Sequence, residues 1–234
     1  MVSEPKALAI ILARAGSNGV PRKNTVDCIC AGRPLIDWTI EDALDAQLVA
    51  RTVVSTNDPA TVLHLQAHWP DVLIDKRPER LAGPNVSSEA AMEPIIAAHS
   101  DFNLVVLLQL TSPVRTGKDV DDAIALLREA KANSLVSVVA SHALLWDYDG
   151  TRPPAPSYII ERRPFKQDLL FHQWEENGSI YVFTRDYWER TRNRLGGRVV
   201  LFAMPEETRL QVDSPLDLFL IERLLERERV LAGQ

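Results

Sequence analysis

Residues 7–24 read ALAIILARAGSNGVPRKN. The seven apolar residues at the start predict a strand that is buried on both faces, as in a parallel sheet. The loop that follows contains two glycines and a serine, which allow backbone N–H groups to turn toward a bound anion. Arg14, Arg22 and Lys23 add positive charge around that loop. This combination suits a triphosphate, whose oxygens accept hydrogen bonds from backbone amides and from charged side chains.

The same loop allows a simpler interpretation, a glycine-containing turn with solvated basic residues. Two common phosphate-binding motifs are excluded. The glycine spacing is wrong for a Walker A loop, and no Gly-Lys-Ser/Thr opens a helix. The Gly-x-Gly-x-x-Gly fingerprint of dinucleotide-binding proteins is absent as well.

Apolar runs and helical periodicity alternate along the first 140 residues. Further buried strands are predicted at Val53–Thr56, Val72–Ile74, Leu104–Gln109 and Leu135–Ala140. Helices are predicted between them at Leu35–Ala46, Pro59–Trp69, Glu89–His99 and Val120–Ala130. The alternation predicts a three-layer α/β fold, in which a mostly parallel sheet carries helices on both faces. Ligands of such sheets bind beyond the carboxyl ends of the strands.

The alternation breaks near residue 142. Residues 142–176 are rich in aromatic residues and proline and contain few helical signals, so we predict an extended arm inserted in a single domain that spans residues 1–234. Strands resume at Ser179–Phe183 and Val199–Phe202. A final helix is predicted to begin at Pro215, with Ser214 as its N-cap.

Composition excludes several classes of protein. The 234 residues carry a net charge of −6 and no long Lys/Arg run, which argues against a nucleic-acid-binding surface. Cys28 and Cys30 are one residue apart, a poor spacing for a zinc knuckle or a disulfide, so we expect free thiols in a reducing compartment. No apolar segment has the length of a signal peptide or a membrane span, and we expect a soluble, cytoplasmic protein.

Five segments, in order, carry a resemblance to a known family. They are Leu12–Asn24, Arg77–Ala82 with Ser87 and Ser88, Leu108–Arg115, Asn177–Tyr181 and Val212–Asp217. Together they resemble the acylneuraminate cytidylyltransferases, also called CMP-sialic acid synthetases. The resemblance implies a sheet like that of the nucleotide-diphospho-sugar transferases. It also implies transfer of CMP from CTP to a nonulosonic (sialic-type) sugar acid, with release of pyrophosphate.

The resemblance also implies roles for individual residues. The nucleotide would be bound by Arg14, Gly16, Ser17, Asn18, Arg22, Lys23, Asn24, Arg77 and Ser88. The acceptor would be bound by Gln109, Thr111, Ser112, Arg115, Lys166, Gln167, Asn177 and Tyr181. Arg14, Lys23 and Asp213 would be catalytic, with Asp213 as the ligand of Mg²⁺ and Lys23 opposite the departing pyrophosphate.

Several residues also have ordinary structural interpretations. Ser87 or Ser88 could cap the helix that starts near Glu89. Arg115 either pairs with an acid or anchors its loop to a nearby carboxylate, and Tyr181 is also compatible with an ordinary strand aromatic. Asp217 lies in the first turn of the last helix, where negative charge is favoured.

The chain departs from the family pattern near the expected chemistry. Asn18 stands where the family usually has lysine, and we expect Arg22 to substitute for the lost charge. Gln211 stands in place of the first of two aspartates, which questions binding of a metal by two carboxylates. Three alternatives therefore stay open: another acceptor such as a phosphonate, another nucleoside triphosphate, or a nucleotide-binding paralogue without catalysis. The resemblance also implies a homodimer formed through the 142–176 arm, although that arm would also suit a cover over its own active site.

Overall fold

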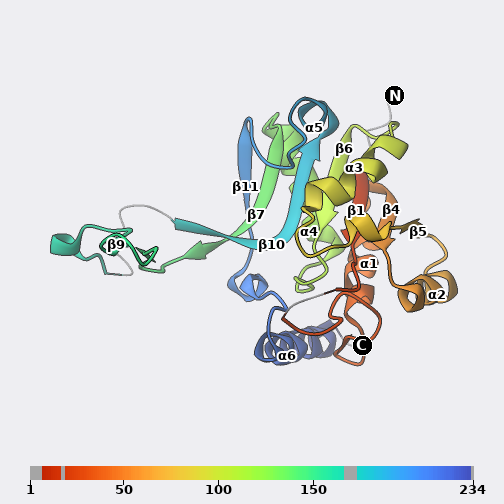
Figure 1. Cartoon of the computed structure of the whole chain (residues 1–234), viewed down its shortest axis with the longest axis horizontal. Coiled ribbons are helices and arrows are strands. Elements are labelled where there is room, and N and C mark those ends of the chain that lie inside the picture. The colour runs from red at the N-terminus through yellow and green to blue at the C-terminus, as the bar shows by residue number, and fades with distance from the viewer. Residues whose placement is uncertain (1–6, 17–18, 166–172, 233–234) are drawn as a thin grey trace.

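A seven-stranded sheet organises the protein, for which the computed structural model describes residues 7–16, 19–165 and 173–232. The strand order is β11-β7-β10-β6-β1-β4-β5 (Figure 1). The strands are β1 (Ala7–Leu12), β4 (Val49–Thr56), β5 (Leu73–Lys76), β6 (Leu104–Leu108), β7 (Ser134–Ser141), β10 (Gln173–Thr184) and β11 (Val199–Ala203). Strand β10 runs antiparallel to β6 and β7, and the other pairs are parallel. The predicted mostly parallel sheet is confirmed.

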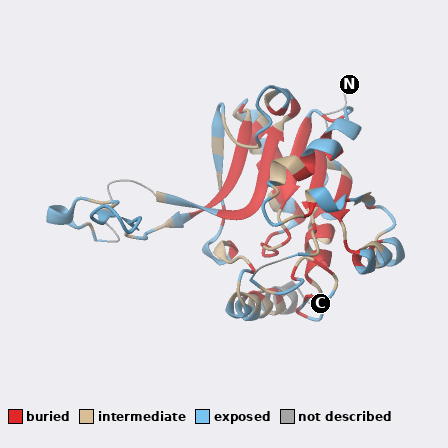
Figure 2. Cartoon of the chain, viewed as in Figure 1, coloured by how far each residue is buried: buried red, intermediate tan, exposed pale blue. Residues whose placement is uncertain are grey.

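Helices cover both faces of this sheet, as predicted. They are α1 (Leu35–Asp45), α2 (Pro59–His68), α3 (Ser88–Ala98), α4 (Gly117–Glu129), α5 (Arg185–Thr191) and α6 (Pro215–Ala232). Leu8 and Ile10 of β1 join the core beneath α3 and α5, whereas Ile11 joins the core shared with α1, α4 and α6. The alternation gives β1 buried side chains on both faces, so the strand is apolar throughout (Figure 2).

Side-chain caps fix where several helices begin. Asp58 accepts a hydrogen bond from the Thr61 amide at the start of α2, which has a proline in its first turn. Thr116 and Asp119 form a reciprocal capping box at α4. Ser214 accepts from the amide of Asp217, whose carboxylate accepts from Ser214 in return, so the predicted capping of α6 is confirmed.

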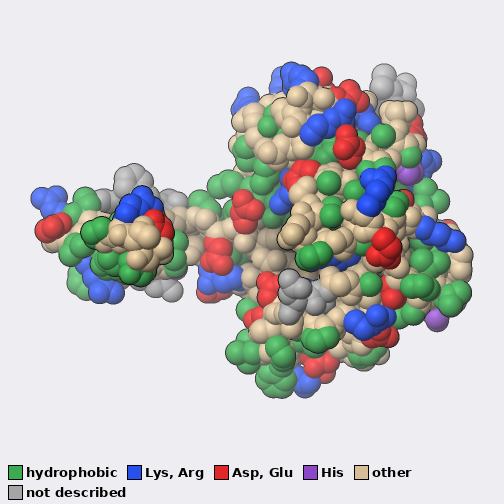
Figure 3. Space-filling view, in the orientation of Figure 1, with side chains coloured by type: hydrophobic (Ala, Val, Ile, Leu, Met, Phe, Trp, Pro, Cys, Tyr) green, Lys and Arg blue, Asp and Glu red, His purple; other side chains and the backbone are tan. Residues whose placement is uncertain are grey.

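The 142–165 segment stands away from the sheet as part of an arm. Strands β7 and β10 extend past the sheet as a two-stranded ribbon, with an irregularity in register between Glu176 and Tyr181 (Figure 1). At the end of the arm lie β8 (Trp146–Asp147), β9 (Ala155–Pro156) and the 3₁₀ turn Ile160–Arg162. Its large apolar side chains are mostly exposed: Leu145, Trp146, Tyr148, Ile159, Ile160, Phe165 and Trp174 (Figure 3).

The remaining elements are short. Strands β2 (Ile29–Cys30) and β3 (Arg33–Pro34) form a small hairpin before α1, and 3₁₀ turns cover Glu79–Leu81 and Glu206–Arg209. In the hairpin Cys28 and Cys30 are free and buried. Within the described ranges, no helix combines the length and the apolar content that crossing a membrane requires.

Candidate active site

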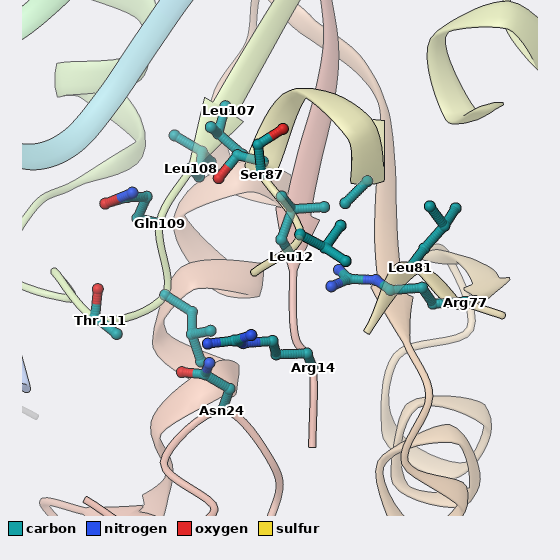
Figure 4. Close-up of a pocket in the computed structure, with 14 residues that line it drawn as sticks. Leu12, Arg14, Asn24, Arg77, Leu81, Ser87, Leu107, Leu108, Gln109 and Thr111 are labelled. Atoms are coloured by element: carbon teal, nitrogen blue, oxygen red, sulfur yellow. The ribbon is translucent and has the colours of Figure 1, made fainter. Parts of the chain in front are cut away.

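A pocket of about 210 Å³ lies where β1 and β6 end and α3 begins (Figure 4). The first loop, the Arg77–Ser88 segment and the β6–α4 loop all contribute to it. It is lined by Leu12, Arg14, Asn24, Arg77, Leu81, Val86, Ser87, Ser88, Ala91, Leu107, Leu108, Gln109, Leu110 and Thr111. Three of the segments that the sequence marked as similar to the cytidylyltransferases therefore meet in one pocket, at the carboxyl edge of the sheet.

Two guanidinium groups and an amide give the pocket its polar side. Arg14 donates from Nη1 to the carbonyl of Gly83 at 2.7 Å. Arg77 is buried and donates from Nε and Nη2 to the hydroxyl and carbonyl of Ser55, at 3.0 and 2.9 Å. Burial lowers the pKa of Arg77 to about 10, so this group is still a cation at neutral pH. The pocket therefore presents fixed positive charge to a ligand.

Asn24 adds an unsatisfied acceptor. Its Oδ1 is buried and has no hydrogen-bond partner among the described residues. A buried amide oxygen without a partner costs free energy, of order 1–3 kcal/mol. A ligand that donates a hydrogen bond at this point of the pocket would remove that cost.

Gln109 and Thr111 lie in the pocket as predicted, at the end of β6. Ser87 and Ser88 both line the pocket as well, but they do different things locally. The Ser87 hydroxyl accepts from the Ala90 amide at 3.1 Å and caps α3, whereas Ser88 is the first residue of that helix. The capping alternative therefore holds for Ser87.

Lys23 and Asp213 meet beside the first loop. Lys23 Nζ lies 2.6 Å from Asp213 Oδ1 and 2.5 Å from the Val212 carbonyl oxygen. Gly19 packs against the same segment: a Cβ built at this residue would lie 1.9 Å from the Asp213 carbonyl oxygen. Two of the predicted catalytic residues, 190 positions apart, are thus brought together by the fold.

Arg22 is not among the residues that line the pocket, and its expected substitution for the lysine missing at position 18 stays a prediction. Its guanidinium pairs with Asp27 and, at 2.9 Å, with Asp58 at the start of α2. Asp58 is the N-cap of α2, and the Arg22 side chain itself is 48% exposed. Gly16, by contrast, has open space around it, which a ligand could approach closely. Four predicted contacts, Ser17, Asn18, Lys166 and Gln167, lie outside the described residues.

Arg115 is an anchor inside the protein, so its prediction as an acceptor contact is corrected. Its side chain is fully buried. Nη1 donates to the carbonyls of Gln109 and Ser112, at 3.0 and 2.6 Å, and Nε lies 3.3 Å from Asp42 of α1. Of the two alternatives that the sequence left open, the loop anchor is the one observed.

Ser112 and Asn177 are also buried, and their polar groups bond within the protein. Asn177 donates to Thr208 at 2.9 Å and accepts from the Ser137 hydroxyl at 2.6 Å. Ser112 donates to the Asn177 carbonyl at 3.1 Å. These bonds join β10 to its neighbours, so we correct both residues from acceptor contacts to structural ones.

Tyr181 is a buried strand aromatic on β10. Its hydroxyl donates to Glu176 at 3.1 Å, and the guanidinium carbon of Arg194 lies 4.7 Å from its ring centroid. Burial and the nearby Glu176 carboxylate raise the pKa of Tyr181 to about 12. Leu107, its partner on β6, lines the pocket, so Tyr181 supports that wall from one strand away.

Asp213 is exposed enough to bind a metal, with 69% of its side chain accessible. No cluster of three or more His, Cys, Asp or Glu side chains that would hold an ion occurs among the described residues. The side-chain amide of Gln211 instead lies beside Gly178, whose φ of 65° is in the left-handed region that favours glycine. A single carboxylate fits Mg²⁺, which commonly takes one or two carboxylates and completes its shell with substrate phosphates and water.

Asn57 is a residue near the site that the sequence reasoning missed. It directly follows β4, and its side chain accepts from the Ala15 amide at 2.9 Å and donates to Glu79 at 3.0 Å. A polar residue at the carboxyl end of a buried strand is a recognisable signal for such a position.

Comparisons with known proteins agree with this geometry. Residues 8–146 match the family model described as "Cytidylyltransferase". The chain is 28% identical over 213 residues to N-acylneuraminate cytidylyltransferase B of Danio rerio, covering 89% of this chain and 49% of that protein. It is 27% identical over 226 residues to N-acylneuraminate cytidylyltransferase of Escherichia coli O18:K1:H7, covering 91% and 50%. The chain thus spans about half the length of the curated relatives it matches.

Solved structures show the same fold. CMP:2-keto-3-deoxy-manno-octonic acid synthetase complexed with CTP superposes with a TM-score of 0.67 at 20% identity, over 95% of this chain and 99% of that one. The 4-diphosphocytidyl-2C-methyl-D-erythritol synthase of Anaerococcus prevotii gives 0.68 at 12% identity, over 95% and 96%.

Proposed function

The chain belongs to the cytidylyltransferase family, and we propose that it transfers a cytidylyl group from CTP to a sialic-type sugar acid. The observation that carries the proposal is the convergence of the first loop, the Arg77–Ser88 segment and the end of β6 on one pocket with two cations. The relatives named N-acylneuraminate cytidylyltransferase, which match along almost the whole chain, support the choice of acceptor.

In the proposed reaction the anomeric hydroxyl oxygen of the acceptor bonds to the α-phosphorus of CTP. The bond from that phosphorus to the oxygen bridging to the β-phosphate breaks, pyrophosphate leaves with that electron pair, and the hydroxyl proton passes to solvent water. Such transfers depend on positioning and on neutralisation of charge. Arg14 and Lys23 would neutralise phosphate oxygens, and Lys23 would exchange its contact with Asp213 for one with the departing pyrophosphate.

The nucleoside would occupy the inner part of the pocket. Leu12, Leu81 and Leu107 provide apolar walls for a planar base or a sugar, while Asn24 offers its unsatisfied oxygen to a donor. The exocyclic amine of cytosine and the ribose hydroxyls are such donors. Gln109 and Thr111 would then lie at the junction with the acceptor.

Mg²⁺ is the metal we propose, with Asp213 as its ligand from the protein. When bound, it would offset the negative charge of the phosphate groups. The exposure of the Asp213 side chain supports this assignment.

We also propose that the protein is a homodimer joined through its arm. The side chains of Trp146, Tyr148 and Phe165 are exposed in the described part of the arm, and aromatic residues are enriched where proteins meet. Light scattering after size exclusion should give twice the chain mass for the wild type and a lower mass for Trp146→Glu. A monomer at all concentrations tested would refute the dimer. We place the enzyme in the cytoplasm, where its two buried thiols would stay reduced.

The direct test is release of pyrophosphate from CTP with Mg²⁺, measured across a panel of nonulosonic acids and phosphonates. Turnover with a sialic-type acid is expected. If only a phosphonate is turned over, the proposed acceptor is wrong, but the proposed use of CTP still holds. A melting screen against the four triphosphates tests the nucleotide, because a ligand at 100 times its dissociation constant adds about 2.7 kcal/mol of stability. No turnover and no shift with CTP would refute the proposal.

A further inference from the structure

Two loops that line the pocket are joined by one side chain outside it. Asn57 Oδ1 accepts from the amide of Ala15, in the first loop, at 2.9 Å. Asn57 Nδ2 donates to Glu79 Oε1, at the start of the Glu79–Leu81 turn, at 3.0 Å. Arg14 and Leu81, the neighbours of these two partners in their loops, both line the pocket.

The chemistry of the partners fixes how the Asn57 amide is oriented. The Ala15 N–H can only donate and the Glu79 carboxylate can only accept, so the oxygen must face Ala15 and the nitrogen must face Glu79. Asparagine satisfies both at once. A carboxylate at this position would still accept from Ala15 but would repel Glu79, and an alanine would lose both bonds.

We infer that Asn57 is a positioning residue that sets the spacing between the phosphate-binding loop and the nucleoside-binding segment. The inference rests on the proposed function, in which CTP spans these two loops. Arg14 supplies a second link between the same segments through Gly83, at 2.7 Å. Arg14 lines the pocket and would have to serve the nucleotide, whereas Asn57 does not line it and can hold the loops before CTP arrives. Holding them in advance lowers the ordering cost of binding.

The bond between Asn57 and Glu79 can be broken and rebuilt by substitution. Glu79→Gln keeps it, because the new amide oxygen can accept from Asn57, and it serves as the matched control. Asn57→Asp breaks it. The double variant Asn57→Asp with Glu79→Gln rebuilds it with the direction reversed, since the new amide at position 79 can donate to the new carboxylate at position 57. The double variant also has the same net charge as the wild type.

The experiment measures CTP affinity by calorimetry without acceptor, together with kcat, KM and the melting temperature. We expect Asn57→Asp and Asn57→Ala to weaken CTP binding about tenfold, with the change mainly in KM and less than about twofold in kcat. Glu79→Gln should stay within about twofold of the wild type, and the double variant should recover to within about threefold.

Equal affinity in all variants would overturn the inference. So would a double variant as weak as Asn57→Asp, because rebuilding the bond would then restore nothing and the loss would not depend on that bond. A simple charge effect predicts tighter CTP binding by Glu79→Gln and none of the loss in Asn57→Ala, and that pattern would overturn it as well. If the wild type binds no triphosphate, both the proposed function and this inference are refuted. If the wild type binds CTP and the variants bind it equally well, only this inference is refuted.

Discussion

Substituting Gly19 by alanine should disable the site by displacing its two catalytic segments from each other. A Cβ at position 19 would lie 1.9 Å from the Asp213 carbonyl oxygen and 3.0 Å from the Asp213 carbonyl carbon. Both atoms belong to the backbone, so no side chain can rotate away. Ordinary van der Waals contact begins near 3.4 Å, so the two segments must separate by roughly 1.5 Å, and a misplacement of about 1 Å can cost about 10²-fold in rate.

Gly16 provides a matched control in the same loop. A Cβ built there meets nothing within 4 Å, and neither glycine has a φ in the left-handed region, so the two alanine substitutions differ in space and not in backbone strain. We expect kcat/KM for CTP to fall about 100-fold in Gly19→Ala. Gly16→Ala adds a methyl group without a clash against the backbone, so it should lose less of kcat/KM than Gly19→Ala does.

Pyrophosphate release at saturating acceptor measures both variants, with circular dichroism and melting temperature to show that each is folded. Because the clash lies between a loop and the segment before α6, the sheet should keep its stability and the melting temperature should change little. Full activity in Gly19→Ala would show that the contact between the first loop and Asp213 is unimportant, which contradicts the reasoning. Equal loss in both variants would also contradict it.

Three further predictions concern charges near the site. Lys23→Gln should lower kcat for pyrophosphate release about 10²- to 10³-fold. Asp213→Asn should lower kcat by a smaller factor when no Mg²⁺ is added. A Lys23→Gln variant with the kcat of the wild type would exclude Lys23 from catalysis. Arg115→Met should leave the Gln109 and Ser112 carbonyls without their hydrogen bonds from Nη1 and lower the free energy of unfolding by about 3 kcal/mol, as measured by urea denaturation. A loss of CTP affinity at unchanged stability would return Arg115 to the substrate contacts. Burial opposes ionisation of Asp58, but hydrogen bonds from Thr61 and from Arg22 outweigh it and hold the pKa of this carboxyl below its ordinary 3.8. The stability that the ionised Asp58 contributes is therefore present above pH 3.8 and is lost as the pH falls further. In urea denaturation from pH 7 to pH 3, Asp58→Ala should be about 1 kcal/mol less stable than the wild type at pH 7 and should lose less stability on acidification, and an unchanged pH profile would contradict the prediction.

The sequence predicted the layers of this protein because they depend on patterns that are local in the chain. The apolar runs that became β1, β4, β6 and β7 are buried on both faces, and a strand of that kind has to be apolar at every position. The antiparallel direction of β10 between two parallel neighbours could not be derived in this way, because the alternation of side chains is the same in either direction.

Part of the site was also local. The glycines and basic residues of the first loop directly follow a buried strand, and Gln109 and Thr111 follow another, so the carboxyl edge of the sheet was a sound place to expect a ligand. The same rule would have included Asn57, which follows β4 in the same way.

What only the tertiary structure decided is the partner of each polar side chain. Arg22 and Lys23 are adjacent in the sequence, yet Arg22 turns to Asp58 and Lys23 reaches Asp213, 190 residues away. Asn177 is polar and matched a family motif, yet it is satisfied inside the protein by Ser137 and Thr208. A charge or an amide shows in the sequence what it can bond to, but the register of strands and loops far apart in the chain determines which atoms come within 3 Å of it.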